Sequence, residues 1–150
     1  MIKLNFPDFE FKLKKIDNKT FIFDFLRKKY FLLTPEEWVR QHVLNFLVIK
    51  KIPLTHIAVE KKITINNLNK RFDVVVYNNI GHVIMLIECK SPSVKLTQNV
   101  FDQISIYNMN LKSKYCMVTN GLDHLYFKID KLSKKFTFVK DFPIKWKLLL

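Results

Sequence analysis

Residues 84–92 read Ile-Met-Leu-Ile-Glu-Cys-Lys-Ser-Pro, an apolar run that ends in an acid and an amine two positions apart. Because side chains alternate across a β-strand, Glu88 and Lys90 are predicted to share one face of this strand. Cys89 is predicted to point to the opposite face and to behave as a small apolar core residue. One face of a buried strand therefore carries both charges.

A second carboxylate belongs to the preceding strand. Asp73 stands near the start of residues 71–77, which are otherwise mostly apolar, and an Asn-Asn-Ile-Gly turn leads on to the next strand. If this turn leaves Asn78 facing Val83, Asp73 lies directly across from Glu88. Two carboxylates and an ammonium then converge. The alternative is that they form only a partly buried salt-bridge cluster.

This cluster predicts metal-dependent hydrolysis of a phosphodiester bond. Two hard oxygen ligands on neighbouring strands suit Mg²⁺, with Mn²⁺ as a substitute, because Mg²⁺ takes one or two carboxylates and completes its shell with water and phosphate oxygens. The ion would activate a water and neutralise charge on the phosphate. Lys90 would position or deprotonate that water and offset charge in the transition state. Asp73, Glu88 and Lys90 are the predicted centre of an active site.

The surrounding elements are predicted from periodicity and turn residues. Thr34 can cap a helix, Pro35 suits its first position, and Glu37 completes a capping box. In chain order we expect a β-hairpin of strands 9–15 and 20–25, a helix from Thr34 to about Lys50, strands at 56–65, 71–77 and 83–89, a helix at 97–111, a strand at 115–119, and weaker strands at 123–129 and 135–139.

The predicted fold class is α/β, with a mixed central sheet flanked by helices and an N-terminal β-hairpin. At 150 residues the chain fits one domain and can bury roughly two-thirds of the surface that its unfolded form exposes. Within a single domain of residues 1–150 we expect a hairpin extension at 1–33, a core at 34–140 and a basic C-terminal tail at 141–150.

The charge balance points to a polyanionic partner. The chain has 26 Lys and Arg against 13 Asp and Glu, a formal net charge of +13. Such a charge concentrates nucleic acid near the protein and speeds its capture. The alternative is a genome rich in Lys, Asn, Ile and Phe codons, whose proteins are basic without binding anything.

Composition excludes several other classes of protein. Apolar residues are dispersed among charges, and the N-terminus lacks the pattern of a secretory signal, so we expect a cytoplasmic protein that does not enter a membrane. With only Gly81 and Gly121, the chain has no glycine-rich phosphate loop. Its two cysteines and four histidines lack disulfide or zinc spacing. No small-molecule cofactor is expected.

The motifs together resemble a known nuclease superfamily. Asp73, followed by Glu88-Cys-Lys90 at the end of the next strand, looks like the PD-(D/E)XK signature with Phe72 in place of its leading Pro. From about residue 20 to residue 140, the chain more closely resembles the N-terminal nuclease domain of type I restriction enzyme R subunits. The segments that carry this resemblance are Leu33–Gln41, Arg71–Tyr77, Glu88–Pro92 and Val118–Gly121.

The resemblance implies a restriction-endonuclease-like core and a Mg²⁺-dependent DNA endonuclease. It also implies that the backbone carbonyl of Cys89 joins Asp73 and Glu88 as a metal ligand. In type I enzymes this domain is joined to a translocating helicase motor, which is not expected within these 150 residues. We therefore expect the cut site to come from a helicase or specificity partner protein, from a DNA end, or from intrinsic preference.

A further motif lies on the helix predicted at 97–111. The family is similar to RecB-type nucleases, which place a Gln-x-x-x-Tyr pair after the catalytic strand, and Gln103 and Tyr107 match it. Residues four apart project from one helical face, so both side chains could bond a phosphate or support Lys90. The alternative is an ordinary amphipathic helix with Tyr107 half buried. The resemblance favours a catalytic role for the pair.

The resemblance also implies an additional acidic metal ligand on the first helix. Glu37 is accounted for by the capping box, whereas Glu36 shares a helical face with the apolar stripe that should lie on the sheet, so we choose Glu36. Glu60, in the middle of a strand, is a further candidate metal ligand. Its alternative role is to pair with Lys62 or Arg71.

Two other classes of function compete with a nuclease. A binding module would keep the fold and the positive surface without cleaving nucleic acid, although the set of two acids and a lysine is complete. A structural or toxin-neutralising role has no supporting feature in the sequence. Cleavage assays with Mg²⁺, with EDTA and with a Lys90→Ala control discriminate among these classes.

Overall fold

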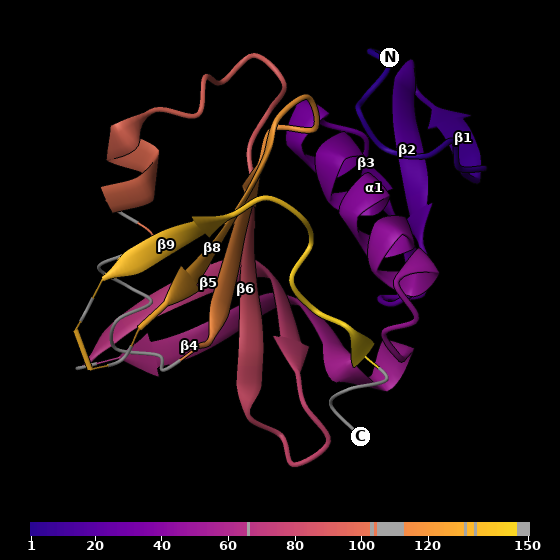
Figure 1. Ribbon diagram of the computed structural model, residues 1–150. Helices are drawn as coiled ribbons and strands as arrows, with labels where there is room; N and C mark the ends of the chain where they lie inside the picture. The colour runs from indigo at the N-terminus through magenta and orange to yellow at the C-terminus, as the bar shows by residue number, and fades with distance from the viewer. Residues whose placement is uncertain (66, 103, 105–112, 131, 134, 147–150) are drawn as a thin grey trace.

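The computed structural model describes residues 1–146 apart from 66, 103, 105–112, 131 and 134. It contains two β-sheets with a long helix between them (Figure 1). In chain order the elements are β1 (Leu13–Ile16), β2 (Lys19–Asp24), β3 (Lys29–Leu32), α1 (Pro35–Ile49), the 3₁₀ turn η1 (Leu54–His56), β4 (Ile57–Ile65), β5 (Leu68–Tyr77), β6 (Val83–Cys89), β7 (Tyr115–Thr119), β8 (His124–Ile129) and β9 (Phe136–Val139).

The larger sheet has the strand order β4-β5-β6-β7-β8-β9. Neighbouring strands run antiparallel except β6 and β7, which run parallel, so the sheet is mixed. A parallel pair needs a crossover connection, and the connection from β6 to β7 includes the helical residues 98–102. The predicted α/β class with a mixed sheet is confirmed, as is the pairing of the strand that carries Asp73 with the strand that carries Glu88.

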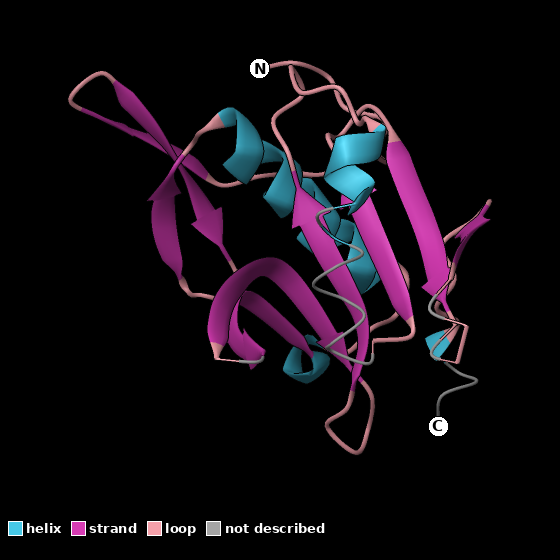
Figure 2. Cartoon of the chain, turned by 90° about the vertical axis from the view of Figure 1, so that its left-hand side faces the viewer, coloured by secondary structure: helices cyan, strands magenta, loops and turns pink. Residues whose placement is uncertain are grey.

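Helices cover both faces of this sheet (Figure 2). Helix α1 starts where predicted, with the Thr34 hydroxyl accepting the Glu37 N–H at 3.1 Å. Its stripe packs on one face in a core that contains Val39, Val43, Leu44, Leu47, Val74, Val76, Met85, Ile87 and Met117. The opposite face carries a second core, in which Phe101 and Ile104 of the crossover pack with Val75, Leu86, Cys116, Val118 and Phe127.

The register between β5 and β6 agrees with the prediction. Val74 pairs with Ile87, so one further step along both strands places Asp73 across from Glu88. The turn itself differs from the prediction, because Tyr77 rather than Asn78 faces Val83. A register shift next to Tyr77 then restores the predicted pairing.

Hydrogen bonds made by Asn78 explain the different turn. Its backbone N–H donates to the His82 carbonyl at 2.9 Å, and its side-chain Oδ1 accepts the His82 N–H at 2.8 Å. An Asn side chain that bonds its own turn in this way is a common substitute for backbone pairing. Asn78 therefore closes the turn with His82 and is not free to face Val83.

The N-terminal residues form a three-stranded sheet, where a hairpin was predicted. The pairing of β1 with β2 is confirmed, but β3 was not predicted and pairs along the other edge of β2. Asp24 makes the extra turn, because its Oδ1 accepts the backbone N–H groups of Leu26 and Arg27, each at 2.8 Å. The third strand therefore depends on a side-chain contact that strand periodicity does not reveal.

The C-terminal tail packs against the larger sheet as far as residue 146. Ile144 and Trp146 are buried, and the Trp146 ring lies 4.7 Å from the ring of His56. No helix within residues 1–146, as far as they are described, is long and apolar enough to cross a membrane.

Candidate active site

Two carboxylates and a lysine meet where β6 ends beside β5. Lys90 Nζ lies 3.1 Å from Glu88 Oε1, while Cys89 belongs to the core on the α1 side, as strand alternation predicts. Asp73 is held against β6 because its Oδ2 accepts the Cys89 N–H at 2.7 Å. The side chains of Asp73 and Glu88 are 15% and 13% exposed. The cluster is therefore largely shielded from solvent.

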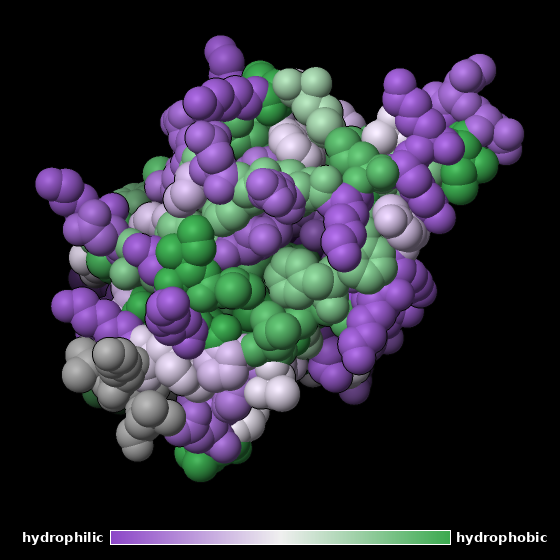
Figure 3. Space-filling view, turned by 90° about the vertical axis from the view of Figure 1, so that its right-hand side faces the viewer, coloured by the Kyte–Doolittle hydropathy of each residue, from purple (hydrophilic) through white to green (hydrophobic). Residues whose placement is uncertain are grey.

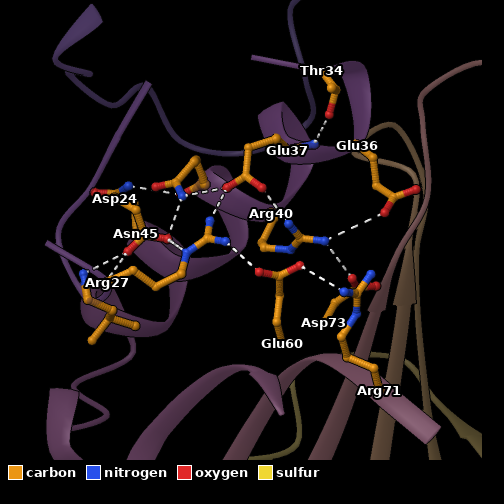
Figure 4. A network of polar contacts seen from close by, with 12 residues as sticks. Asp24, Arg27, Thr34, Glu36, Glu37, Arg40, Asn45, Glu60, Arg71 and Asp73 are labelled. Atoms are coloured by element: carbon orange, nitrogen blue, oxygen red, sulfur yellow. Dashed lines mark hydrogen bonds and ion pairs between the residues drawn. The ribbon is translucent and has the colours of Figure 1, made fainter. Parts of the chain in front are cut away.

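Arg40 on α1 occupies the other oxygen of Asp73. Its Nη2 lies 2.6 Å from Asp73 Oδ1, and its guanidinium also contacts Glu37 and, at 3.5 Å, Glu36 (Figure 4). Burial acts to lower the pKa of Arg40, but Asp73 and Glu37 outweigh it and the pKa is raised. Arg40 is a buried, permanent positive charge that neutralises Asp73.

Glu88 is the least compensated carboxylate of the cluster. Burial raises the pKa of Glu88, Asp73 raises it further, and Lys70 and Lys90 oppose this only in part. Glu88 Oε2 is buried and has no hydrogen-bond partner among the residues that the structure describes. A buried acceptor without a partner is costly, so this oxygen would gain from a cation placed beside it.

Asp73 and Glu88 fit a Mg²⁺ site built on two carboxylates. Mg²⁺ keeps several waters and binds few protein ligands, so two acids are sufficient. Asp73 can offer Oδ1 only if Arg40 turns to its other acidic partners. In the described part of the chain, no three His, Cys, Asp or Glu residues are arranged to hold a metal ion. An ion held by this pair would need water and substrate oxygens for its remaining positions.

A row of three acids crosses neighbouring strands. Val59 pairs with Val74, so Glu60 on β4 lies opposite Asp73, as Glu88 does on the other side. Glu60 has a φ of +51°, which is unusual for a residue other than glycine and interrupts the pairing with β5 at this point. Such local strain is often found at functional sites.

The two additional acidic candidates, Glu36 and Glu60, have different surroundings. The Glu36 side chain is 48% exposed, and Arg40 is its ionic partner. Glu60 pairs with Arg71 at 3.7 Å, one of the two partners suggested for it, and with Arg27 at 2.9 Å. Glu36 shares Arg40 with Asp73, whereas Glu60 is linked to Glu37 through Arg27. Both stay candidate metal ligands.

The contacts of Glu37 differ from the capping box predicted from the sequence. The capping box is only half formed, because Thr34 accepts the Glu37 N–H while the Glu37 carboxylate contacts Arg27 and Arg40 instead of the Thr34 N–H. Two guanidinium groups bind a buried carboxylate more strongly than one backbone N–H does. The capping argument that set Glu37 aside was therefore wrong.

Arg27 connects the N-terminal sheet to the site. It contacts the fully buried Asp24 at 2.7 Å, Glu60 at 2.9 Å, and Glu37 (Figure 4). Gln41 reinforces the link, because its Nε2 donates to Asp24 at 2.8 Å and to Glu37 at 2.9 Å. A continuous chain of ion pairs thus runs from β2 through α1 to the acids of the larger sheet.

Sequence reasoning missed Arg27 and Arg40. Arg40 did carry a signal, because it follows Glu36 by four residues and adjoins the apolar stripe of α1, where a buried cation requires an acidic partner. Arg27 lies in a turn of charged residues and carried no comparable signal.

The end of β7 supports the segment that follows Lys90. The Lys90 N–H donates to the Thr119 carbonyl at 2.8 Å, and Asn120 Nδ2 donates to the Val94 carbonyl at 2.9 Å. Gly121 has a φ of +86°, and a Cβ there would lie 2.8 Å from a methyl group of Leu4. Only glycine adopts this conformation readily. The motif at 118–121 therefore positions the lysine-bearing segment.

Gln103 and Tyr107 lie outside the residues that the structure describes. Their described neighbours Phe101 and Ile104 are buried on the sheet. The catalytic role of the pair stays a prediction.

Fold and site define an α/β domain whose mixed sheet presents two carboxylates and a lysine at a strand end. The family described as type I restriction enzyme R protein N terminus matches residues 35–143. The chain belongs to this family. The match contains Glu36, Glu60 and the Asp73 cluster, and it begins after β3.

A solved structure agrees at the level of fold. It is a fragment assigned to the HsdR subunit of a type I restriction enzyme from Vibrio vulnificus YJ016, with a TM-score of 0.53 and 19% sequence identity. The similarity covers 75% of this chain but only 24% of that chain. A comparison with curated proteins found no match.

Proposed function

We propose that this chain is a Mg²⁺-dependent nuclease that hydrolyses phosphodiester bonds in DNA on a PD-(D/E)XK core. The observation that carries the proposal is the buried, unpartnered Oε2 of Glu88 beside Asp73 and Lys90. Native structures leave few buried polar atoms unpaired, and perturbed acids cluster at functional sites. Membership of the R-subunit family supports the same reaction and an endonuclease.

Asp73 and Glu88 would hold the ion, with the backbone carbonyl of Cys89 as a third proposed ligand. When bound, Mg²⁺ supplies a more acidic water and neutralises charge on the scissile phosphate. The Cys89 N–H orients Asp73 toward this position through its bond to Oδ2. Arg40 has Glu36 and Glu37 as further partners, so it can release Asp73 Oδ1 without becoming unpaired.

In this proposal Lys90 is the cationic member of the cluster, 3.1 Å from Glu88. Burial acts to lower the pKa of Lys90, but Glu88 and Asp73 outweigh it and the pKa is raised. The two carboxylates therefore favour the ammonium form of Lys90. It can donate to a phosphate oxygen or to the attacking water and offset the charge that develops in the transition state.

The roles of four further residues, the second metal and the partner protein are also proposals. Gln103 and Tyr107 would contact phosphate or Lys90, and Glu36 and Glu60 would assist metal binding. Mn²⁺ would substitute for Mg²⁺. A helicase or specificity protein of a restriction complex would supply the cut site, as the R-subunit family suggests.

A DNA-binding module that does not cleave is the second candidate. It is favoured by one observation: both oxygens of Asp73 are engaged, Oδ1 by Arg40 and Oδ2 by the Cys89 N–H. If Arg40 does not release Asp73, the site binds no catalytic ion.

The test is cleavage of supercoiled plasmid and linear DNA with Mg²⁺ or Mn²⁺, and with EDTA. Lys90→Ala is the test variant, and Lys61→Ala, an exposed lysine on β4, is its matched control. A nuclease cleaves with the metal, stops with EDTA and with Lys90→Ala, and is unaffected by Lys61→Ala. DNA binding without cleavage under every condition supports the second candidate.

A further inference from the structure

We propose that the outward face of the N-terminal sheet binds single-stranded DNA next to the candidate active site. The proposal rests on the proposed nuclease function only for the choice of DNA as the nucleic acid. Strands β1, β2 and β3 all precede residue 35, where the family match begins. The match to the family therefore does not include this sheet.

Burial distinguishes the two faces of the small sheet. Ile22 and Asp24 of β2 are fully buried and mark the inward face. Phe21 and Phe23 project to the other face, because neighbouring residues of a strand point to opposite sides. Residues paired across the strands lie on the same face. On the outward face, Ile16 of β1 therefore lies beside Lys19, and Lys14 of β1 lies beside Phe21. From β3, Leu32 lies beside Phe21 and Tyr30 lies beside Phe23.

The outward face combines lysines with aromatic rings. The exposed Lys12, Lys14 and Lys19 lie on it, with Lys14 Nζ 4.0 Å from the centre of the Tyr30 ring and Lys12 Nζ 5.9 Å from that of Phe23. The two rings are 5.2 Å apart. Ammonium groups that bind phosphates, set beside rings on which bases can stack, are the combination that binds single strands without sequence preference.

Charge complementarity favours a polyanion on this face. Residues 12–32 contain six Lys and one Arg against two Asp. One of the acids, Asp24, is buried and paired with Arg27, so its charge is neutralised below the surface. None of the outward-facing residues of β1 to β3, all of which the structure describes, is acidic. Exposed Leu32 and Ile16 add apolar contact area suited to bases.

The position of the sheet suits a strand that leaves the active site. Arg27, between β2 and β3, contacts Glu37 and Glu60, so this end of the sheet borders the site. The turn between β1 and β2 projects from the body of the molecule (Figure 2), and its surface is mainly hydrophilic at the upper right of Figure 3. The six residues of β2 span about 20 Å, which leaves room for several nucleotides.

The test measures DNA binding by the full chain in EDTA, so that cleavage does not enter. The probes are a fluorescent oligothymidine and a fluorescent duplex of the same length. Each probe is titrated with protein at several salt concentrations, and binding is followed by fluorescence anisotropy. The test variant is Lys12→Gln/Lys14→Gln/Lys19→Gln. The matched control, Lys128→Gln/Lys135→Gln/Lys140→Gln, removes the same charge from exposed positions around β9, at the far edge of the larger sheet.

The test variant should bind the single strand more weakly, and the slope of log K against log salt should fall by about 2, at about 0.7 for each lost phosphate contact. Tyr30→Ala should weaken single-strand binding by about 5- to 150-fold, the loss expected for one stacked base. The β9 control should keep the wild-type slope. Thermal melts of all variants establish that they are folded.

Three results would overturn the proposal. The first is an unchanged slope in the Lys12/Lys14/Lys19 variant. The second is an equal change in the β9 control, which would mean that net charge alone governs binding. The third is an equal loss on duplex and single strand, which would exclude the single strand as the preferred occupant. Because no result depends on cleavage, failure of the nuclease assay leaves this test intact.

Discussion

Replacement of Arg27 by Met should destabilise the protein strongly, although Arg27 lies outside the candidate metal cluster. Its side chain is only 13% exposed and contacts three carboxylates, Asp24, Glu37 and Glu60. Met keeps the apolar stem but leaves the fully buried Asp24 and the buried Glu37 each without one cationic partner. Breaking a buried pair by removing one partner costs about 3–5 kcal/mol.

The expected loss of unfolding free energy corresponds to a decrease in the melting temperature, Tm. In a domain of this size, 1 kcal/mol shifts Tm by about 2–4 °C, so Arg27→Met should melt about 6–20 °C below wild type. Urea unfolding followed by tryptophan fluorescence should give a matching loss of free energy. Trp38 reports on α1, the helix to which Arg27 is bound.

Arg71→Met is the matched control for this experiment. The Arg71 side chain is 63% exposed and lies 3.7 Å from Glu60, so its removal should cost less than about 1 kcal/mol. The reasoning about the buried ion-pair chain is refuted if Arg27→Met costs no more than Arg71→Met.

Two further outcomes follow from buried charged groups. Arg40→Gln should lower the Tm measured in EDTA. Mn²⁺ should raise the Tm of this variant more than that of wild type, because Asp73 and Glu88 are then both available as metal ligands. Equal shifts of Tm with Mn²⁺ would contradict this prediction. Burial lowers the pKa of His42 from its ordinary value of 6.5. As pH falls, His42 is therefore protonated in the unfolded chain at a higher pH than in the folded protein. The free energy of unfolding should decrease between about pH 7 and pH 5.5 for this reason. His42→Phe should lose less over this interval in urea unfolding, and parallel pH curves would exclude the assignment.

The sequence predicted the larger sheet well because its central strands contain apolar runs, such as residues 74–77, 83–87 and 115–118, separated by clear turn residues. The position of Asp73 across from Glu88 was predicted from a wrong turn, since Asn78 pairs with His82 and a register shift at Tyr77 compensates. The register of these two strands therefore depends on the register shift beside Tyr77 as well as on the turn.

Side-chain contacts between distant segments were the part that the sequence did not reveal. The strand β3 depends on the Asp24 turn. The contacts of Arg27 with Glu37 and Glu60, and that of Arg40 with Asp73, join segments that meet only in the folded chain. Local propensity contains no information about such partners. The choice of Glu36 over Glu37 relied on a capping box whose second bond is absent, because guanidinium groups bind Glu37.

Cleavage of DNA by Glu88→Gln, compared with wild type at saturating protein and Mg²⁺, tests the proposed metal centre most directly. Gln has nearly the same shape as Glu but is a much weaker Mg²⁺ ligand, and DNA affinity should persist because it comes from distributed Lys and Arg contacts. We expect Glu88→Gln to bind DNA as wild type does in EDTA and to show no metal-dependent cleavage. Cleavage at the wild-type rate by Glu88→Gln would contradict a metal centre at Asp73 and Glu88.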